Sequence, residues 1–373
     1  MSWKHLFSRA LDAAPERLHF AAHSHHLWPD ASFAGQVAAW ADAALYADLK
    51  WDRIFGQVIP EAQRHIAAEL SLPDPATIAF APNTHDFLIR IVSAIASPKP
   101  RILATDGEFH SFRRQSLRWH EAGRIDLVTV PAHRLLETAQ GGSFDLIFAS
   151  QMLFNSGQPG ADIAGLAALS HPEGPWVVID GYHGFMATPT DLSAASGRIF
   201  YLGGGYKYAM AGEGACFLHA PRGFAPRPEL TGWYAAFDDL AAQLGGVGYA
   251  PDGRRFLGST FDPSGLYRFN AVQRMLAAEG LTTATISAHV ALLKEQFIAA
   301  VALRDFALIS APEARFLAYE GKRAAALQAA LEARNVITDV RGDVLRIGFA
   351  LYHDAEDVAR LLANLREIGP GPG

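Results

Sequence analysis

The fold follows from Tyr201-Leu202-Gly203-Gly204-Gly205-Tyr206-Lys207-Tyr208, an apolar strand that leads through glycines to a lysine. Upstream of it stands Val177-Val178-Ile179-Asp180-Gly181-Tyr182-His183, an apolar strand that ends at an aspartate. Ligands of open α/β sheets bind beyond the carboxyl ends of the strands. The two segments therefore predict a ligand site that contains Lys207 and Asp180.

A lysine and an aspartate in this arrangement suit pyridoxal 5'-phosphate (PLP). The lysine can form a Schiff base with the PLP aldehyde, and the aspartate can pair with the pyridinium nitrogen and keep the ring an electron sink. Burial beside a cationic ring would lower the pKa of Lys207 and make its amine nucleophilic. On local grounds alone, Lys207 can also be a surface lysine, Asp180 a turn cap and His183 a satisfied core histidine.

Composition is that of an enzyme of some size. The 373 residues are half hydrophobic and carry a net charge of -6, which predicts a large core and two domains. The 32 Lys and Arg stand against 38 Asp and Glu without long like-charged runs, so we expect neither nucleic acid nor a membrane as partner. The sole cysteine, Cys216, cannot form an internal disulfide. Together with the lack of a signal sequence or a membrane-spanning run, it predicts a cytoplasmic protein.

Hydrophobic periodicity predicts the secondary structure. Apolar residues recur at steps of three and four from Trp51 to Leu70, and again from Thr84, which indicates two amphipathic helices. Short apolar runs predict strands at residues 101–104, 125–128, 146–149, 176–179 and 199–202. Because helical stretches separate most of these strands, we predict an α/β fold with a mainly parallel sheet covered by helices.

The pattern changes near residue 260, where we place the edge of the large domain. Residues 264–278 and 283–303 are predicted to be helices, and residues 343–349 a strand. This gives an N-terminal segment (residues 1–50) that reaches the active site, a large PLP-binding domain (residues 51–260) and a small C-terminal α+β domain (residues 261–373).

The chain resembles the fold-type-I PLP enzymes of the class V aminotransferase group, and within that group the kynureninases. Gly205-Tyr206-Lys207-Tyr208 is similar to the Ser-Tyr-Lys-Tyr around their Schiff-base lysine, and Asp180 and His183 keep their Asp-x-x-His spacing. Leu230-Thr231-Gly232-Trp233 and Phe256-Leu257-Gly258-Ser259-Thr260 are similar to their Gly-Trp and Phe-Leu-x-Gly-Thr segments. The resemblance implies a large domain with a mainly parallel sheet of the seven-stranded type and a small C-terminal α+β domain.

The resemblance also implies which residues surround the cofactor phosphate. By family position, Thr84 and His85 lie on the phosphate side, at the start of a helix whose N–H groups and dipole suit an anion. An ordinary N-cap explains Asn83 or Thr84 equally well. Trp233 and Thr260 would reach a phosphate in the partner subunit, so the resemblance implies a homodimer with a shared active site. As isolated residues, these two are more often packing and turn residues.

Around the cofactor ring, the resemblance places His183 near the ring oxygen or the aspartate, and makes Tyr206 a phenolic donor. Phe109 would stack on the pyridine face, with a core phenylalanine as the alternative. Its segment, Glu108-Phe109-His110-Ser111-Phe112, stands where the family has Phe-Pro-Ser/Thr-Asp. Phe112 replaces the family's aspartate and His110 its proline, so one expected polar contact is missing.

Arg346 is the predicted ligand of the substrate. It stands in Val340-Arg341-Gly342-Asp343-Val344-Leu345-Arg346-Ile347-Gly348-Phe349, which resembles the strand that binds the substrate carboxylate, and an arginine fork binds a carboxylate through two hydrogen bonds. Ser24 and His25 stand where kynureninases have an Asn-Ser-Leu-Gly stretch that approaches the site, so we expect them to contact the substrate. The histidines of His23-Ser24-His25-His26 have no carboxylate or cysteine at ligand spacing, so we expect no metal.

These features predict a PLP enzyme that acts on an α-amino acid, by kynureninase-like hydrolysis of a side-chain carbon–carbon bond. An aminotransferase or epimerase on the same scaffold is the alternative, which the altered Phe112 and His25 positions make credible. A non-catalytic binding protein would not need Lys207, Asp180 and Arg346 together. A cysteine desulfurase would need a mobile nucleophilic cysteine, whereas Cys216 falls in a predicted buried strand.

Overall fold

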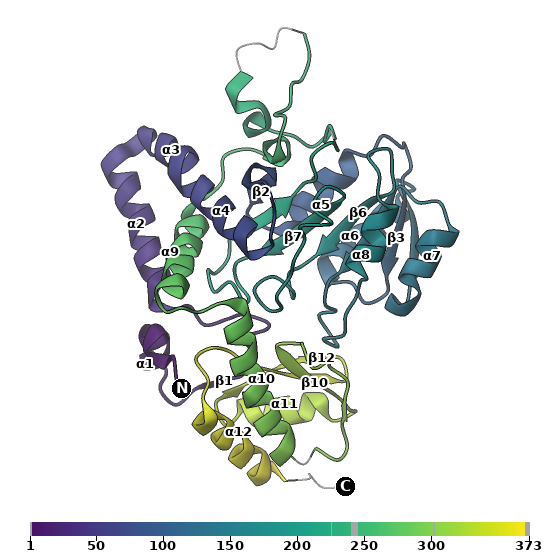
Figure 1. The fold of residues 1–373 in the computed structure, drawn as a ribbon. Coiled ribbons are helices and arrows are strands. Elements are labelled where there is room, and N and C mark those ends of the chain that lie inside the picture. The colour runs from purple at the N-terminus through teal and green to yellow at the C-terminus, as the bar shows by residue number, and fades with distance from the viewer. Residues whose placement is uncertain (1, 225, 240–244, 302, 370–373) are drawn as a thin grey trace.

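The computed structural model describes residues 2–224, 226–239, 245–301 and 303–369. Its largest sheet has seven strands in the order β2-β8-β7-β6-β5-β3-β4 (Figure 1). These strands are β2 (Ile78–Ala81), β3 (Arg101–Thr105), β4 (Asp126–Val130), β5 (Leu146–Ser150), β6 (Trp176–Asp180), β7 (Ile199–Gly204) and β8 (Cys216–His219). Neighbours are parallel except at β8, which runs antiparallel to β7 and β2. The predicted mainly parallel sheet is confirmed.

Helices cover both faces of this sheet. In β5, Ile147 joins one apolar cluster and its neighbours Leu146 and Phe148 join another, because successive strand residues point to opposite faces. The first cluster includes residues of α4 (Ile59–Glu69), α7 (Leu135–Gly141) and α8 (Ile163–Leu169). The second includes residues of α5 (Thr84–Ser93) and α6 (His110–Glu121). The predicted α/β architecture is thereby confirmed.

The amphipathic helix predicted from Trp51 to Leu70 is present but contains a π-helical turn. It consists of α3 (Lys50–Arg53), the π turn η3 (Ile54–Val58) and α4. Pro60 lies in the first turn of α4 and has no N–H to donate to the carbonyl one turn earlier. The missing donor accounts for the wider turn just before it.

A second sheet lies in the C-terminal part of the chain and has the antiparallel order β12-β13-β10-β9. Its strands are β9 (Ala307–Leu308), β10 (Phe316–Glu320), β12 (Asp339–Arg341) and β13 (Val344–Gly348). Apolar residues of α10 (Thr283–Ala300), α11 (Ala324–Glu332) and α12 (Ala355–Ile368) pack against it. The predicted helix at 283–303 and strand at 343–349 correspond to α10 and β13.

The N-terminal chain crosses between the two sheets. β1 (Leu18–His19) pairs in parallel with β11 (Val336–Ile337), and Ala21 forms a bridge with Gly348. Further along, the His26 N–H donates to the Tyr206 carbonyl at 3.1 Å. Residues 20–26 therefore run from the C-terminal sheet to the loop that carries Lys207. The domain boundaries at residues 50 and 260 stay predictions.

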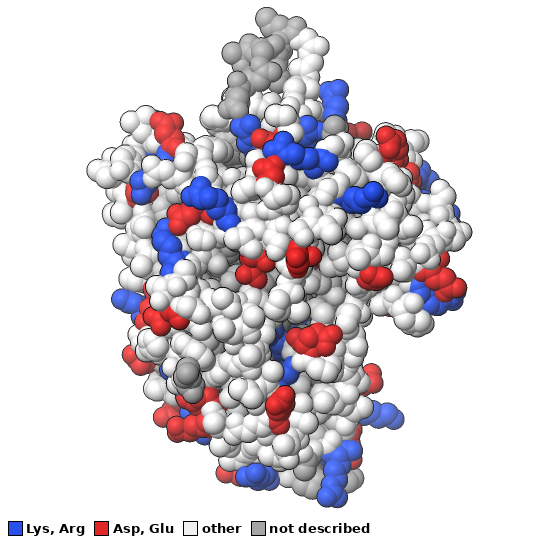
Figure 2. Space-filling view, viewed as in Figure 1, with Lys and Arg blue, Asp and Glu red and all other residues white. Residues whose placement is uncertain are grey.

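The remaining helices are short, apart from α2 (Asp30–Tyr46) and α9 (Ser264–Ala278), which lie side by side (Figure 1). The short ones are η1 (Lys4–Phe7), α1 (Ser8–Asp12), η2 (Ala47–Leu49), η4 (Pro75–Thr77), η5 (Ala132–Arg134), η6 (Trp233–Asp239) and η7 (Gly253–Phe256). Among the described residues, no single helix is long and apolar enough to cross a membrane; α9 and α10 pass that test only as a pair bent by 78°. Basic and acidic side chains are interspersed over the face shown in Figure 2.

The contact between α2 and α9 requires glycine at position 35. A Cβ atom there would lie 2.7 Å from the Cα atom of Arg268 and from the carbonyl oxygen of Tyr267. Overpacking costs about 1–3 kcal/mol, and backbone atoms cannot turn away as a side chain can. Alanine is favoured over glycine in a helix by about 1 kcal/mol. We expect Gly35→Ala to lower the free energy of unfolding, measured by urea denaturation.

Gly141→Ala is the matched control, because Gly141 ends α7 and nothing lies within 4 Å of the added Cβ. This control should be as stable as the parent protein or slightly more stable. Equal stability of the two variants would show that the helix contact yields at no cost.

Candidate active site

A pocket of about 210 Å³ lies beyond the carboxyl ends of β5, β6 and β7. The strand register sets its position, because Ser150 pairs with Asp180, which in turn pairs with Leu202. The pocket brings together seven of the predicted site residues. These are Thr84, His85, Phe109, Asp180, His183, Tyr206 and Lys207. The crevice beyond the strand ends is thus formed by side chains that lie far apart in the sequence.

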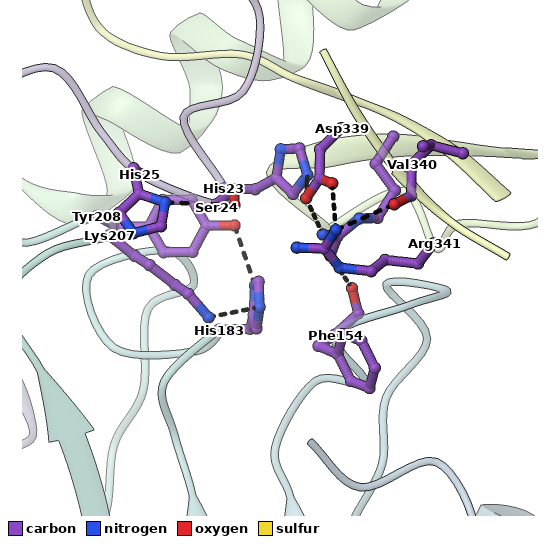
Figure 3. Close-up of polar contacts among 11 residues, drawn as sticks. His23, Ser24, His25, Phe154, His183, Lys207, Tyr208, Asp339, Val340 and Arg341 are labelled. Carbon is purple, nitrogen blue, oxygen red and sulfur yellow. Dashed lines mark hydrogen bonds and ion pairs between the residues drawn. The ribbon is translucent and has the colours of Figure 1, made fainter. Parts of the chain in front are cut away.

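Lys207 is buried, with 5% of its surface exposed. Its Nζ atom lies 2.8 Å from Nε2 of His183 (Figure 3). The ring centre of Tyr182 is 4.8 Å from the same atom. Burial lowers the pKa of Lys207 to about 7; the Asp180 carboxylate opposes this shift and Arg346 adds to it. Lys207 is therefore not a surface lysine, and a large share of its amine is neutral at physiological pH.

Asp180 ends β6 and faces the same pocket. One carboxylate oxygen accepts the N–H of Tyr182 at 2.9 Å, so the residue does cap the following turn. Burial raises the pKa of Asp180, whereas this hydrogen bond and the nearby Lys207 lower it. The turn cap and the pocket role are compatible, since the hydrogen bond fixes the carboxylate where it lines the pocket.

His183 connects the lysine to a tyrosine. Its Nδ1 atom lies 3.4 Å from the hydroxyl of Tyr208, while Nε2 contacts Lys207 (Figure 3). Burial, followed by the charges of Lys207 and Arg346, holds the pKa of His183 well below its usual value. A neutral imidazole at this place can accept a hydrogen bond from the lysine.

The N-terminus of α5 forms another wall of the pocket. Asn83 is its N-cap, because its side-chain oxygen accepts the Asp86 N–H at 2.9 Å. Thr84 and His85 line the pocket itself. The Nδ1 atom of His85 is buried and has no hydrogen-bond partner, and the helix end favours negative charge. This wall is therefore suited to an anionic group.

Aromatic rings form the remaining wall. Phe109 is the N-cap residue of α6 and meets Phe154 edge-on, with ring centres 5.3 Å apart. Tyr182 and Tyr206 pack at 4.8 Å, and the ring of His25 stacks on Tyr206 at 5.1 Å. A flat aromatic ligand would therefore meet rings in this pocket.

Phe112 takes no part in the pocket. It stacks on Phe148 in the core at 4.0 Å, in the place where the resemblance led us to expect an aspartate. The polar contact that the aspartate would supply is therefore absent at this position.

Five predicted site residues do not line the pocket. Ser24 contacts the ring of His25, which in turn stacks on Tyr206. Trp233 is 44% exposed, and Thr260 lines a separate surface groove with Arg90. The fifth residue, Arg346, lies behind Phe154 and is 3% exposed.

Arg346 already has partners. It donates to the Phe154 carbonyl at 2.6 Å and forms an ion pair with Asp339, the residue opposite it on β12. Arg341, five residues before Arg346, binds the other oxygen of Asp339 at 2.8 Å. Side chains of a strand alternate between the two faces of a sheet. Followed across the Arg341-Gly342-Asp343 turn, this alternation could have identified Asp339 as the partner of Arg346.

Sequence reasoning also missed Glu108, which lies behind the pocket wall. It is fully buried and accepts hydrogen bonds from the hydroxyls of Thr105 at 2.5 Å and Ser150 at 2.6 Å. Burial raises the pKa of Glu108 to about 7, and Asp180 adds a smaller contribution in the same direction. In the described part of the chain, no group of three or more His, Cys, Asp or Glu residues is placed to hold a metal ion.

No protein-family model matches the sequence, and no curated protein is significantly similar to it. Solved structures are similar in fold. The cystine C-S lyase C-DES, in complex with its reaction product cysteine persulfide, matches with a TM-score of 0.82 and 19% identity, over 96% of this chain and 100% of that one. A C-DES variant with glycine covalently linked to its PLP cofactor gives a TM-score of 0.83 at 18% identity, over 99% and 100% of the two chains.

The cysteine desulfurase CsdA from Escherichia coli matches with a TM-score of 0.80 and 18% identity, over 98% of this chain and 97% of that one. These likenesses show the fold: the chain has the fold of the PLP-dependent enzymes of fold type I. They are likenesses to enzymes of carbon–sulfur chemistry, so they do not extend to the kynureninase activity that the sequence suggested.

Replacement of Asp180 tests the electrostatics of the pocket. Because the Asp180 carboxylate favours the charged form of Lys207, Asp180→Asn should move the pKa of Lys207 below about 7. The measurement is the pH dependence of acylation of the ε-amine, followed by mass spectrometry of the peptide that contains residue 207, on protein freed of small molecules. Asp48→Asn, at an exposed position in η2, should leave the midpoint unchanged. A midpoint that stays or rises in Asp180→Asn would contradict the assignment.

Proposed function

We propose that this chain is a PLP-dependent enzyme that acts on an α-amino acid, and that its reaction is kynureninase-like hydrolysis of a side-chain carbon–carbon bond. One observation carries the proposal: the buried amine of Lys207, with a pKa near 7, lies within one pocket with Asp180, His183 and an aromatic wall. A structural lysine has no need of such an environment, whereas a nucleophilic one does.

The residues present fit PLP. The unpartnered Nδ1 atom of His85 and the N–H groups that begin α5 suit the phosphate. Asp180 suits the pyridine nitrogen, and the rings of Phe109 and Tyr182 suit the flat faces of the cofactor. Lys207 would hold the aldehyde carbon. When bound, PLP supplies an electrophilic carbon and an electron sink.

Lys207 and His183 have separate roles in the proposed reaction. Lys207 is neutral often enough near pH 7 to take a proton from the substrate Cα and return it. His183 keeps the Nζ atom in position through its 2.8 Å contact. In the net reaction the Cβ–Cγ bond breaks; water gives its hydroxyl to the Cγ carbonyl carbon and its hydrogen to Cβ. The products are alanine and an aromatic acid, and the aromatic wall suits such a side chain.

Cleavage of a carbon–sulfur bond is the second candidate, because the structures most similar in fold include a cystine C-S lyase. In that case the chain's own cysteine is an unsuitable sulfur acceptor. Cys216 is 3% exposed in β8, between β2 and β7, and its sulfur lies 3.4 Å from the Tyr182 hydroxyl. Burial raises the pKa of the Cys216 thiol to about 11, so a nucleophilic thiolate is disfavoured.

We further propose a homodimer with a shared site. Trp233 and Thr260 lie away from the pocket of their own chain, which is consistent with a role at a partner's pocket. Apolar side chains are exposed along α2 and beyond it, among them Trp40 (73%), Leu45 (73%) and Leu49 (68%). Such a surface is typical of protein contacts. Sedimentation of the purified protein tests this proposal.

Lys207→Ala is the direct test of the cofactor assignment. We expect the purified variant to lose the visible absorbance of bound PLP and all turnover, since no other lysine of the described residues lines the pocket. The measurement is an absorbance spectrum beside an activity assay. Lys99→Ala, which changes an exposed lysine, is the control and should keep both. A Lys207→Ala protein that still turned over would refute the role.

A substrate screen separates the reactions. Holoprotein is given kynurenine, cystine and a panel of other amino acids, with and without a keto acid. Alanine release from kynurenine is the expected result. Release of sulfur from cystine would favour the lyase, and amino transfer to the keto acid would favour an aminotransferase.

A further inference from the structure

The guanidinium group of Arg346 is fully enclosed, yet one of its donors is free. Its two terminal nitrogens bind the Phe154 carbonyl and the Asp339 carboxylate. Its Nε atom is buried and has no hydrogen-bond partner. A buried donor without a partner costs free energy, so the present arrangement leaves Arg346 incompletely satisfied. It can gain from a ligand with two acceptor oxygens.

Asp339 has a second potential partner in His23. The ring of His23 is completely buried, and neither of its nitrogens has a hydrogen-bond partner. Its Nε2 atom lies 3.8 Å from the Asp339 carboxylate (Figure 3). Two contacts fix this ring: it stacks on Phe316 at 4.7 Å, and a Cβ at Gly348 would lie 2.2 Å from its Nδ1 atom. Glycine at position 348 is therefore what gives the imidazole its place.

We propose that Asp339 is a displaceable internal ligand of Arg346: the carboxylate of the substrate takes its place, and Asp339 moves to His23. The inference rests on the proposed function and concerns its substrate-binding step. A movement of about 1 Å brings the Asp339 oxygen from 3.8 Å to hydrogen-bond distance from the imidazole. Arg341, which already binds the other oxygen of Asp339, can follow because it is exposed.

The exchange carries a proton with it. Burial is the main cause that holds the pKa of His23 well below its usual value, and Arg346, Lys207, His19 and Arg341 act in the same direction. His183, from the loop after β6, is also close enough to interact with it. The Asp339 carboxylate lies 3.8 Å from His23. Once it leaves Arg346 and bonds to the imidazole, it favours the charged ring, and His23 takes one proton from solvent.

This exchange on Arg346 explains why the site requires a carboxylate in its ligand and does not merely accept one. A ligand without a carboxylate cannot replace Asp339 on Arg346, because it would leave a buried guanidinium without its counter-ion. Only an anionic ligand restores the ion pair that is given up. Selection of an amino acid over an amine thus follows from the exchange of one carboxylate for another.

The test uses holoprotein and 3-phenylpropanoate, a carboxylate that has no amine and does not react with the cofactor. Its binding is measured by titration calorimetry at pH 7 in PIPES and in imidazole, buffers whose ionisation heats differ and which have no primary amine. We expect uptake approaching one proton per bound ligand. The neutral 3-phenylpropanamide should bind at least about tenfold more weakly, because it cannot replace a charged partner.

Asp339→Asn should bind 3-phenylpropanoate about tenfold more tightly, because the competing charge is gone, and without proton uptake. Asp343→Asn is the matched control: its side chain is exposed in the turn after β12, and both affinity and uptake should equal those of the parent. Weaker binding by Asp339→Asn would overturn the proposal, since Asp339 would then only position Arg346.

His23→Phe provides an independent test, because it leaves the Asp339–Arg346 ion pair intact and keeps an aromatic ring against Phe316. We expect loss of proton uptake and about tenfold weaker binding of 3-phenylpropanoate, since the released carboxylate has no imidazole N–H to accept from. Persistent uptake in this variant would overturn the proposal. Unchanged affinity of Arg346→Ala for 3-phenylpropanoate would also overturn the proposal. That result would leave the assignment of PLP to the pocket intact. If the assignment of PLP were wrong, the Lys207→Ala variant would instead have the same visible spectrum as the parent protein.

Discussion

Desolvation of the Lys207 amine governs the chemistry of this pocket. Lys207 lines the pocket but is 5% exposed, and Asp180 is the carboxylate that most favours its charged form. The cost of burying a charge is met by a pKa near neutrality and not by a strong ion pair. The same enclosure keeps His183 neutral and raises the pKa of Asp180. Burial is thus the main cause of the shifted pKa values of Lys207, His183 and Asp180.

The sheet makes this enclosure possible. Parallel strands with both faces covered must be apolar along their length, so polar groups collect where the strands end. Ser150 and Asp180 are the last residues of β5 and β6, and β7 ends at Gly204, from which Gly205 leads to the lysine loop. Behind this row, Glu108 binds Ser150 and fixes the outer end of β5. The pocket is therefore a product of strand register, which few substitutions in the loops would alter.

Hydrophobic periodicity, together with the residues that end each apolar run, predicted those helices and strands that depend on the local sequence. The strands, the helix from Thr84 and the meeting of Lys207 with Asp180 all follow from apolar runs and from what ends them. The interruption near Pro60 and the ion pair of Arg346 were not predicted, since they depend on a missing donor and on the pairing of β12 with β13. The resemblance gave the fold correctly, but carbon–sulfur enzymes share that fold, so the reaction cannot be read from it.

The parallel pairing of Leu18 with Val336 has a consequence for how the molecule is made. Residues 18–26 are synthesised well before Val336–Ile337, the strand that they join. Until that strand is made, the segment can contact Tyr206 but not Gly348. Contacts between segments so far apart in the sequence form slowly during folding. The entropic cost of closing the loop between them rises only weakly with its length. The docking of residues 18–26 between the C-terminal sheet and the loop that carries Lys207 can therefore be completed only after residue 348 has been made.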